Sequence, residues 1–156
     1  MEEISAAAGV SKATVYNRFG GRDGLIDAVI DELVATELDA IMDRALGVDD
    51  PWRAVVAYVT DRRDLQYREP AFTDTLLMTY PHSTQLVALA RAAVATTEVL
   101  LRRGHEAGVV RSDFSVDDLY YADVANGLAL RALPRPPRQD YDRRTRFFLD
   151  GLRPRR

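Results

Sequence analysis

Residues 2–25 read EEISAAAGVSKATVYNRFGGRDGL and decide how the N-terminal end of the chain folds. The stretch predicts two short helices, at 2–8 and 11–19. Gly9 ends the first in the position that suits a left-handed cap, Ser11 can cap the second, and Gly20-Gly21 ends it. Two short helices joined by a glycine-containing turn form a helix-turn-helix, whose second helix enters the major groove of DNA.

The second of these helices has two faces of different chemistry. Val15 and Phe19 are four residues apart and are expected to face inward with Ile4 and Val10. The opposite face carries small, hydroxyl, amide and basic side chains, namely Lys12, Ala13, Tyr16 and Asn17, with Thr14 and Arg18 beside them. Small residues allow close approach to a groove, hydroxyls and the lysine reach phosphates, and an amide can bond base edges.

This segment resembles the DNA-binding motif of the TetR family of transcriptional regulators, I-A-x-x-A-G-V-S-x-x-T-x-Y-x-x-F-x-x-K-x-x-L. The matching residues here are Ile4-Ser5, Ala8-Gly9-Val10-Ser11, Thr14, Tyr16, Phe19, Arg22 and Leu25. The motif is specific, although it covers only about a sixth of the chain. The resemblance implies that double-stranded DNA is contacted by Ser11, Lys12, Ala13, Thr14, Tyr16, Asn17 and Arg18, and that Arg22 holds a phosphate. Arginine in place of the usual lysine at this last position keeps the charge.

The chain departs from the family at its beginning. Members of the family start with a further helix that packs under the helix-turn-helix, and this sequence begins where that helix should already have ended. Without that helix, Ile4, Val15 and Phe19 lose an apolar partner. Leaving ~100 Å² of apolar surface exposed to water lowers the free energy of unfolding by about 2.5 kcal/mol. We favour a true start upstream of Met1. The alternative is a truncated regulator whose helix-turn-helix is less firmly packed.

The remaining sequence predicts an all-α protein, because no stretch alternates apolar and polar residues over six or more positions. Apolar spacing and helix start and stop signals predict helices at 22–46, 51–66, 70–79, 82–105, 117–133 and 141–152. Among these signals are Asp50-Pro51 and a capping box formed by Ser115 and Asp118. We expect a DNA-binding segment at 1–46, with 22–46 as its connecting helix, and an effector-binding and dimerisation domain at 47–156.

The helix expected at 117–133 is apolar on more than one face, so it must bury one face against its own core and another against a second subunit. The resemblance implies that this helix and the one at 141–152 pair with their mates in a four-helix bundle. A homodimer of this kind sets two recognition helices ~34–36 Å apart, or a multiple of that distance, and predicts a palindromic operator.

The resemblance also implies a pocket for a small-molecule effector among the helices at 51–66, 70–79, 82–105 and 117–133. The candidate pocket residues are Tyr58, Phe72, Met78, Tyr80, Leu86, Leu89, Tyr121 and Asn126. An ordinary place in the core is the simpler alternative for each of them. Asn126 is the strongest candidate, since a polar amide on an apolar helix needs a partner.

Several classes of function lack the residues they need. The chain has no cysteine, and His82 and His105 have no second metal ligand at helical spacing, so neither a metal site nor a cofactor is expected. Asp117 and Asp118 suit the first turn of a helix. No phosphate-binding glycine loop or nucleophile elbow is present, which argues against an enzyme.

The distribution of charge and apolar residues indicates where the protein works. An acidic N-terminus and the lack of an 18-residue apolar run predict a cytoplasmic protein with no membrane partner. Residues 131–156 carry nine arginines and three aspartates, although the whole chain has a net charge of −3. We interpret this as a basic C-terminal helix on an acidic body; a basic arm for nucleic acid is the alternative.

The sequence therefore predicts a DNA-binding transcriptional regulator, a repressor that a small-molecule effector releases from its operator. The alternative is an all-α ligand-binding or interaction dimer that no longer reads DNA because its first helix is missing.

Overall fold

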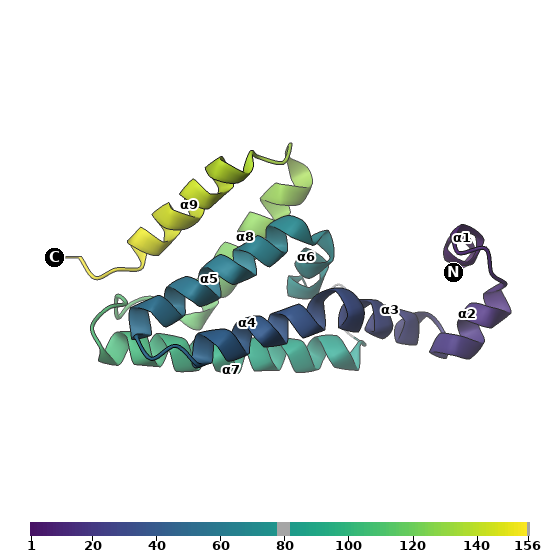
Figure 1. Cartoon of the computed structure of the whole chain (residues 1–156), viewed down its shortest axis with the longest axis horizontal. Coiled ribbons are helices and arrows are strands. Elements are labelled where there is room, and N and C mark those ends of the chain that lie inside the picture. The colour runs from purple at the N-terminus through teal and green to yellow at the C-terminus, as the bar shows by residue number, and fades with distance from the viewer. Residues whose placement is uncertain (78–81, 156) are drawn as a thin grey trace.

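The computed structural model describes residues 1–77 and 82–155, and every regular element in them is helical (Figure 1). The elements are α1 (Glu2–Ala7), α2 (Lys12–Phe19), α3 (Arg22–Ile30), the π-helical turn η1 (Asp31–Ala35), α4 (Thr36–Leu46), α5 (Pro51–Arg68), α6 (Pro70–Leu76), α7 (Thr84–Glu106), α8 (Val116–Ala132) and α9 (Arg138–Gly151). The all-α prediction is confirmed: a helix-turn-helix comes first and a helical bundle follows.

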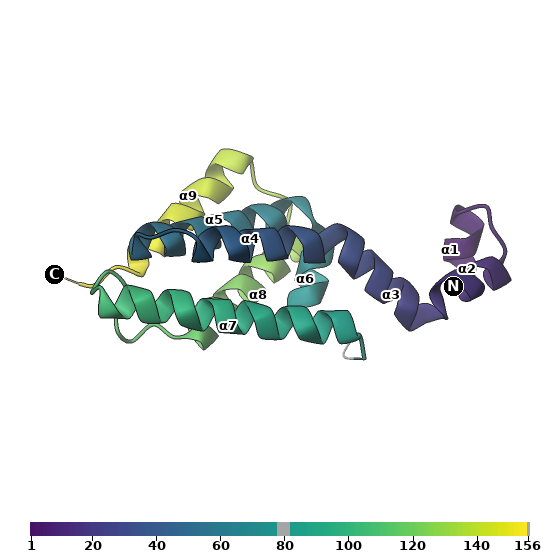
Figure 2. The same ribbon diagram turned by 60° about the horizontal axis from the view of Figure 1, so that its bottom comes forward.

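The helices form a small head and a larger body joined by one long rod (Figures 1 and 2). The head is α1 and α2 at one end of the molecule. The rod is α3, η1 and α4 in succession, and its α4 portion lies in the body, where it packs against α5 and α7. α6 packs against α8, and α9 lies along α5 on the outside of the body. The rod therefore belongs to both parts.

Most predicted helix boundaries follow from local caps. Ser11 Oγ accepts a hydrogen bond from the Thr14 amide at 3.0 Å, and Gly20 ends α2 in the left-handed region at φ 71°. The capping box is present as predicted: Ser115 Oγ accepts from the Asp118 amide, and the Asp118 carboxylate accepts from the Ser115 amide. These pairings fix where α2 and α8 begin.

Several helix limits differ from the prediction, among them the starts of α7 and α9, and the rod is interrupted. α7 begins at Thr84, because Ser83 Oγ caps it by accepting from the Leu86 amide at 3.0 Å, and His82 therefore lies before the helix. α9 begins at Arg138, directly after Pro137. The rod at 22–46 is helical throughout, but η1 interrupts its α-helical hydrogen bonding at 31–35. No capping or proline signal in the sequence marks that interruption.

The core lies in the body. Buried apolar side chains of α4 pack against those of α5, α7 and α8, and they include Leu38, Ile41, Met42, Ala45, Val55, Val59, Leu86, Leu100 and Leu119. Among the described helices, α7 alone is long and apolar enough to cross a bilayer. Length and composition by themselves are weak evidence that a helix spans a membrane. Here it packs against α3, α4, α5, α6 and α8, as a core helix does.

The head leaves part of its apolar surface exposed. Val15 is buried and Phe19 is half-buried, but Ile4 and Val10, which were expected to face inward, are 49% and 42% exposed. The reason is the thinness of the head: α1 packs against α2 and α2 against α3. A single layer of short helices leaves the outer apolar side chains in contact with water.

The candidate DNA-reading head and effector cavity

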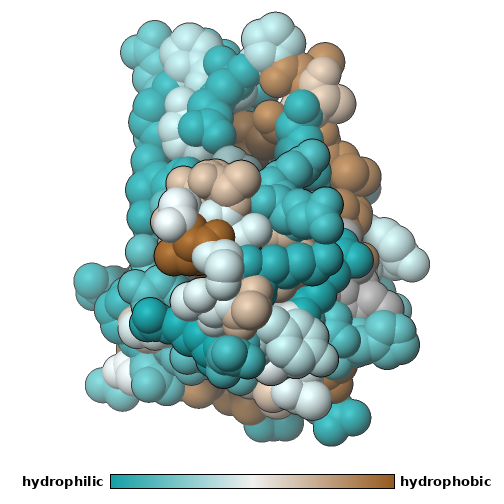
Figure 3. Space-filling model, turned by 90° about the vertical axis from the view of Figure 1, so that its right-hand side faces the viewer, coloured by the Kyte–Doolittle hydropathy of each residue, from teal (hydrophilic) through white to brown (hydrophobic). Residues whose placement is uncertain are grey.

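The predicted DNA-contacting side chains all lie on the surface of the head. The exposed residues are Ser11, Lys12, Ala13, Thr14, Tyr16, Asn17 and Arg18 on or beside α2, and Arg22 in the first turn of α3. The end of the molecule that carries them is mostly polar, with apolar patches between the polar side chains (Figure 3). Tyr16 is 62% exposed, although an aromatic ring of that size is usually covered. The face is therefore accessible to a large partner.

Three of these side chains also hold the head together. Ser11 Oγ lies 2.8 Å from Thr14 Oγ1, so both hydroxyls take part in the cap of α2. Lys12 Nζ donates to Glu2 Oε1 at 3.0 Å, and this hydrogen bond lowers the pKa of the Glu2 carboxyl. Both partners are solvent-exposed, so the pair is weak and the lysine can exchange it for a phosphate.

Two glycines, Gly21 and Gly24, determine how α2 meets α3. Gly24 was not predicted from the sequence. Gly21 has φ 125°, which L side chains rarely adopt, and the Tyr16 ring packs 3.5 Å from where its Cβ would stand. A Cβ at Gly24 would come within 1.9 Å of the Phe19 carbonyl oxygen. The recognition helix is thus set against the rod by a close backbone approach.

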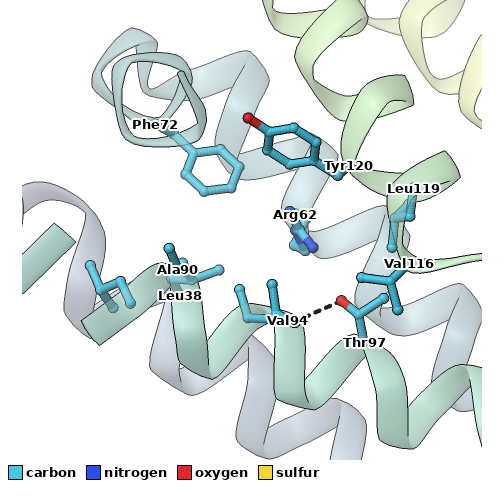
Figure 4. A pocket seen from close by; sticks show the side chains of 11 residues that line it. Leu38, Arg62, Phe72, Ala90, Val94, Thr97, Val116, Leu119 and Tyr120 are labelled. Carbon is cyan, nitrogen blue, oxygen red and sulfur yellow. Dashed lines mark hydrogen bonds between the residues drawn. The ribbon is translucent and has the colours of Figure 1, made fainter. Parts of the chain in front are cut away.

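The body has a cavity of about 100 Å³, partly open to the surface, between α4, α5, α6, α7 and α8 (Figure 4). Its walls are mostly apolar, and it is lined by Leu38, Arg62, Phe72, Leu89, Ala90, Ala93, Val94, Thr97, Val116, Leu119 and Tyr120. Arg62 is the one charged side chain among these residues. A largely apolar hollow with few polar groups is the usual form of a small-molecule site.

Arg62 is held in place by two partners. It is 5% exposed; its Nη1 donates to the Tyr58 hydroxyl at 3.0 Å, and its Nη2 lies 3.0 Å from Asp123 Oδ2. Its buried Nε has no hydrogen-bond partner in the described structure. The guanidinium therefore keeps one donor unpaired, and this nitrogen is itself buried.

Asp123 is the buried counter-ion of two arginines. Its side chain is among the most deeply buried, and its Oδ1 lies 3.8 Å from Arg63 Nε, beyond hydrogen-bond distance. Burial raises the pKa of the Asp123 carboxyl, and the charges of Arg62 and Arg63 oppose that rise. Arg63 packs over the Phe148 ring at 4.2 Å and does not line the cavity.

The predicted pocket residues divide into several groups. Phe72 and Leu89 line the cavity. Tyr58 lies beneath it: its hydroxyl bonds to the Ala93 carbonyl and to Arg62. Leu86 is fully buried in the core and does not line the cavity. Met78 and Tyr80 lie outside the described residues.

Neither Tyr121 nor Asn126 lines this cavity; Asn126 lines a separate hollow beside Tyr141. Tyr121 is 68% exposed, because the residue one position earlier, Tyr120, points to the cavity and a helix turns about 100° per residue. Asn126 finds its polar partners elsewhere. Its amide nitrogen lies 2.5 Å from Gln66 Oε1 and 2.7 Å from the Tyr141 hydroxyl, so it ties α5, α8 and α9 together.

The sequence reading missed Arg62 as a cavity residue, although a signal existed. It lies four residues after Tyr58 and three after Val59, on the buried stripe of α5. An arginine in phase with a buried stripe is the cue that was available.

The rod that carries the head is in contact with the walls of the cavity. The first turn of α7 holds the rod: the Ser83 hydroxyl donates to the Asp27 carboxylate, and Gln85 Nε2 donates to Asp31 Oδ1 at 2.9 Å. Leu89, one turn further along α7, lines the cavity. On the rod, Leu38 lines it three residues after η1 ends. Two of the helices that line the cavity, α4 and α7, therefore belong to the rod or contact it.

The outer surface of α8 and α9 retains apolar side chains. Tyr121, Leu128, Leu133 and Phe147 are each at least 46% exposed. The two helices carry the segments that were predicted to pair with a second subunit. Exposed apolar side chains of this size are available for contact with another protein.

Comparison with known proteins agrees with these two parts. Residues 1–29 match the family of bacterial regulatory proteins named after TetR, and residues 50–154 match the SbtR-like C-terminal domain of transcriptional regulators. A search of curated protein sequences finds no match.

Solved structures of similar fold include three regulators. The TetR family regulator PfmR from Thermus thermophilus is 21% identical with a TM-score of 0.70, over 97% of this chain and 85% of that one. SCO0520 from Streptomyces coelicolor is 25% identical with a TM-score of 0.63, over 99% and 87%. The ketosteroid regulator KstR2 of Mycobacterium tuberculosis is 14% identical with a TM-score of 0.68, over 97% and 83%. The chain therefore belongs to the TetR family of DNA-binding transcriptional regulators.

Proposed function

We propose that this regulator is a repressor that a small molecule, bound in the cavity of the body, releases from its operator. The observation that carries the proposal is the rod: α3 holds the head, and α4, the continuation of α3 beyond η1, forms a wall of the cavity. In this scheme residues 1–46 read DNA, and residues 47–156 bind the effector and dimerise. Regulators of this family are in general not enzymes.

The path from cavity to head runs through η1. A π-helical turn is a local irregularity in a helix and is often found at functional sites. η1 lies between Leu38 at the cavity and the head, and Asp31 within it is tied to Gln85 of α7. An effector that displaces α7 or α4 would therefore bend the rod at this turn and move α2.

The DNA-binding face we propose is the exposed side of α2 with the first turn of α3. Asn17 and Tyr16 would meet base edges and sugar, and Lys12 and Arg22 would meet phosphates. A two-fold dimer formed by α8 and α9 would present two such faces ~34–36 Å apart, or a multiple of that distance. Double-stranded DNA with a palindromic operator is then the partner.

Fluorescence anisotropy with labelled DNA from the region that flanks the gene tests the proposal. The full chain is titrated at about 150 mM salt in excess unlabelled nonspecific DNA, and saturable binding tighter than about 10⁻⁷ M is expected, since nonspecific binding lies nearer 10⁻⁴–10⁻⁶ M. Asn17→Ala should weaken binding to the specific site by roughly tenfold and leave nonspecific binding unchanged.

Glu106→Ala, at the far end of the body, is the matched control. Equal loss of specific and nonspecific binding in Asn17→Ala would remove α2 as the reading helix. Binding no tighter than to unrelated DNA would favour the alternative of a dimer that does not read DNA.

A further inference from the structure

The charges buried beside the cavity do not balance. The guanidinium groups of Arg62 and Arg63 are 5% and 6% exposed, and both face one buried carboxylate, that of Asp123. Two buried positive charges and one buried negative charge leave one positive charge uncompensated in this part of the structure. A buried charge without a partner is costly, so such an arrangement favours the uptake of an anion.

The uncompensated charge is reachable from the cavity through Arg62 alone of the two arginines. Figure 4 shows Arg62 at the cavity among Leu119, Val94 and Tyr120. Its Nη1 and Nη2 are engaged, whereas its buried Nε has no hydrogen-bond partner in the described structure. Arg63 packs over an aromatic ring outside the cavity. An anion in the cavity would thus meet a net positive charge at Arg62, and it could bond to this guanidinium by replacing the Asp123 carboxylate.

The remaining walls restrict what can carry that anion. They are apolar apart from Thr97 and the Tyr120 ring, and Thr97 already donates to the Ala93 carbonyl at 2.7 Å. A volume of about 100 Å³ is smaller than a ~150 Å³ apolar cavity that binds benzene, so the hydrocarbon part of the ligand must be small or must extend through the open side of the cavity. A carboxylate is the flat anion that best matches a guanidinium.

We infer that the effector is a small apolar carboxylic acid, bound as its anion with the carboxylate on Arg62 and the hydrocarbon part against Phe72, Leu89 and Val94. This inference rests on the proposed function, because it takes the cavity as the effector site. Binding would also have a structural consequence. A ligand carboxylate competes with Asp123 for Arg62 and so weakens the contact that joins α5 to α8.

Isothermal titration of the full chain with matched pairs of probes tests the inference without DNA. The pairs are benzoate with benzamide and pentanoate with pentanamide, which differ in charge but hardly in shape. At least one carboxylate should bind saturably, and at least about tenfold more tightly than its amide, because a hydrogen bond to a charged group contributes more than one between neutral groups. Equal binding of acid and amide, or binding of neither carboxylate, would overturn the inference.

Three substitutions in the charge cluster should rank in their affinity for the carboxylate in an order that a merely structural ion pair would not produce. Asp123→Asn removes the competitor for Arg62 and should bind the carboxylate more tightly than wild type. Arg63→Met removes the excess charge but no cavity donor and should bind more weakly. Arg62→Met removes both and should bind weakest, at least about tenfold below wild type.

Circular dichroism identifies the variants that fold, and only these are compared. If none of them folds, the binding of the acid and amide pairs to the wild-type protein still tests the inference. A reversed order, or no change in Arg62→Met, would contradict the role of Arg62. A different result would refute the proposed function. A carboxylate that binds in calorimetry but does not change operator affinity would sustain the anion site and refute effector release.

Discussion

The head and the body of this regulator are stabilised in different ways. The head consists of two short helices held by caps, glycine turns and an exposed Lys12–Glu2 pair, with Ile4 and Val10 open to water. The body has a continuous apolar core and a buried ion pair between Arg62 and Asp123. Stability in the body comes from contacts distant in sequence, whereas the head depends on local ones. The part that would read DNA is therefore the part that is easiest to displace.

The largest expected effect is the removal of the buried carboxylate. Asp123→Ala leaves Arg62 and Arg63 buried without a counter-ion, and breaking a buried pair in this way costs about 3–5 kcal/mol of unfolding free energy. Urea denaturation measures it. The matched control is Asp142→Ala, which breaks the exposed pair with Arg138 and should cost about 0.3–0.5 kcal/mol. Equal losses in the two variants would show that the body is not organised around its buried charges.

A close helix approach in the body should give the next largest effect. A Cβ at Gly127 of α8 would lie 2.6 Å from Gln66 Nε2 and 2.8 Å from Thr73 Oγ1, so Gly127→Ala is expected to destabilise the protein by about 1–3 kcal/mol. Gly151→Ala, where nothing lies within 4 Å, should change stability little. A melting temperature for Gly127→Ala equal to that of wild type would contradict the close packing of α8 on α5 and α6.

The same kind of substitution in the head should affect DNA binding. Gly24→Ala forces the link between α2 and α3 to shift, because the new Cβ would come within 1.9 Å of the Phe19 carbonyl oxygen. We expect a loss of operator affinity of roughly tenfold, the size of one lost base contact, with little change in the unfolding of the body. Gly47→Ala, which meets only ordinary contacts, is the control. A fall in body stability that matched the loss of affinity would show that the two parts are not separable.

The smallest expected effect concerns the surface charges between the rod and α9. Hydrogen bonds from Arg68 and Arg138 lower the pKa of the Asp64 carboxyl against the opposing effect of partial burial, and Arg68 lowers that of Glu37. A carboxyl group whose pKa is lower in the folded than in the unfolded protein stabilises the fold at pH values above its unfolded pKa, which is near 4. This stability is lost as the pH falls through the folded pKa. Thermal unfolding between about pH 5 and pH 3 should show a small loss, under about 1 kcal/mol, that Asp64→Asn reduces. An unchanged pH profile in that variant would remove this cluster from the account.

Sequence reasoning succeeded where the determinants are local. Ser11, Gly20 and the capping box at Ser115 mark helix ends with side chains that act on their own backbone, so these positions could be read directly. The exposed face of α2 followed from helical periodicity alone. The family assignment followed from the same segment.

The cavity was harder to predict because its walls come from five helices. Tyr120 and Tyr121 are neighbours in the sequence, yet one lines the cavity and the other faces outward; only the packing of α8 decides between them. Asn126 was correctly expected to need a polar partner, but its partners lie on α5 and α9 rather than on a ligand. The η1 turn left no signal that the sequence reading could use, since its residues have ordinary helix-forming properties.

The most direct test of the central claim is the distance between the two heads of a dimer. The chain has no cysteine, so Ala7→Cys places one spin label on each exposed α1, and pulsed electron paramagnetic resonance measures the pair. We predict one narrow distance distribution with operator DNA and a clearly shifted one with the carboxylate that binds in calorimetry. The same distribution in both states, with that carboxylate bound, would contradict control of the head from the cavity.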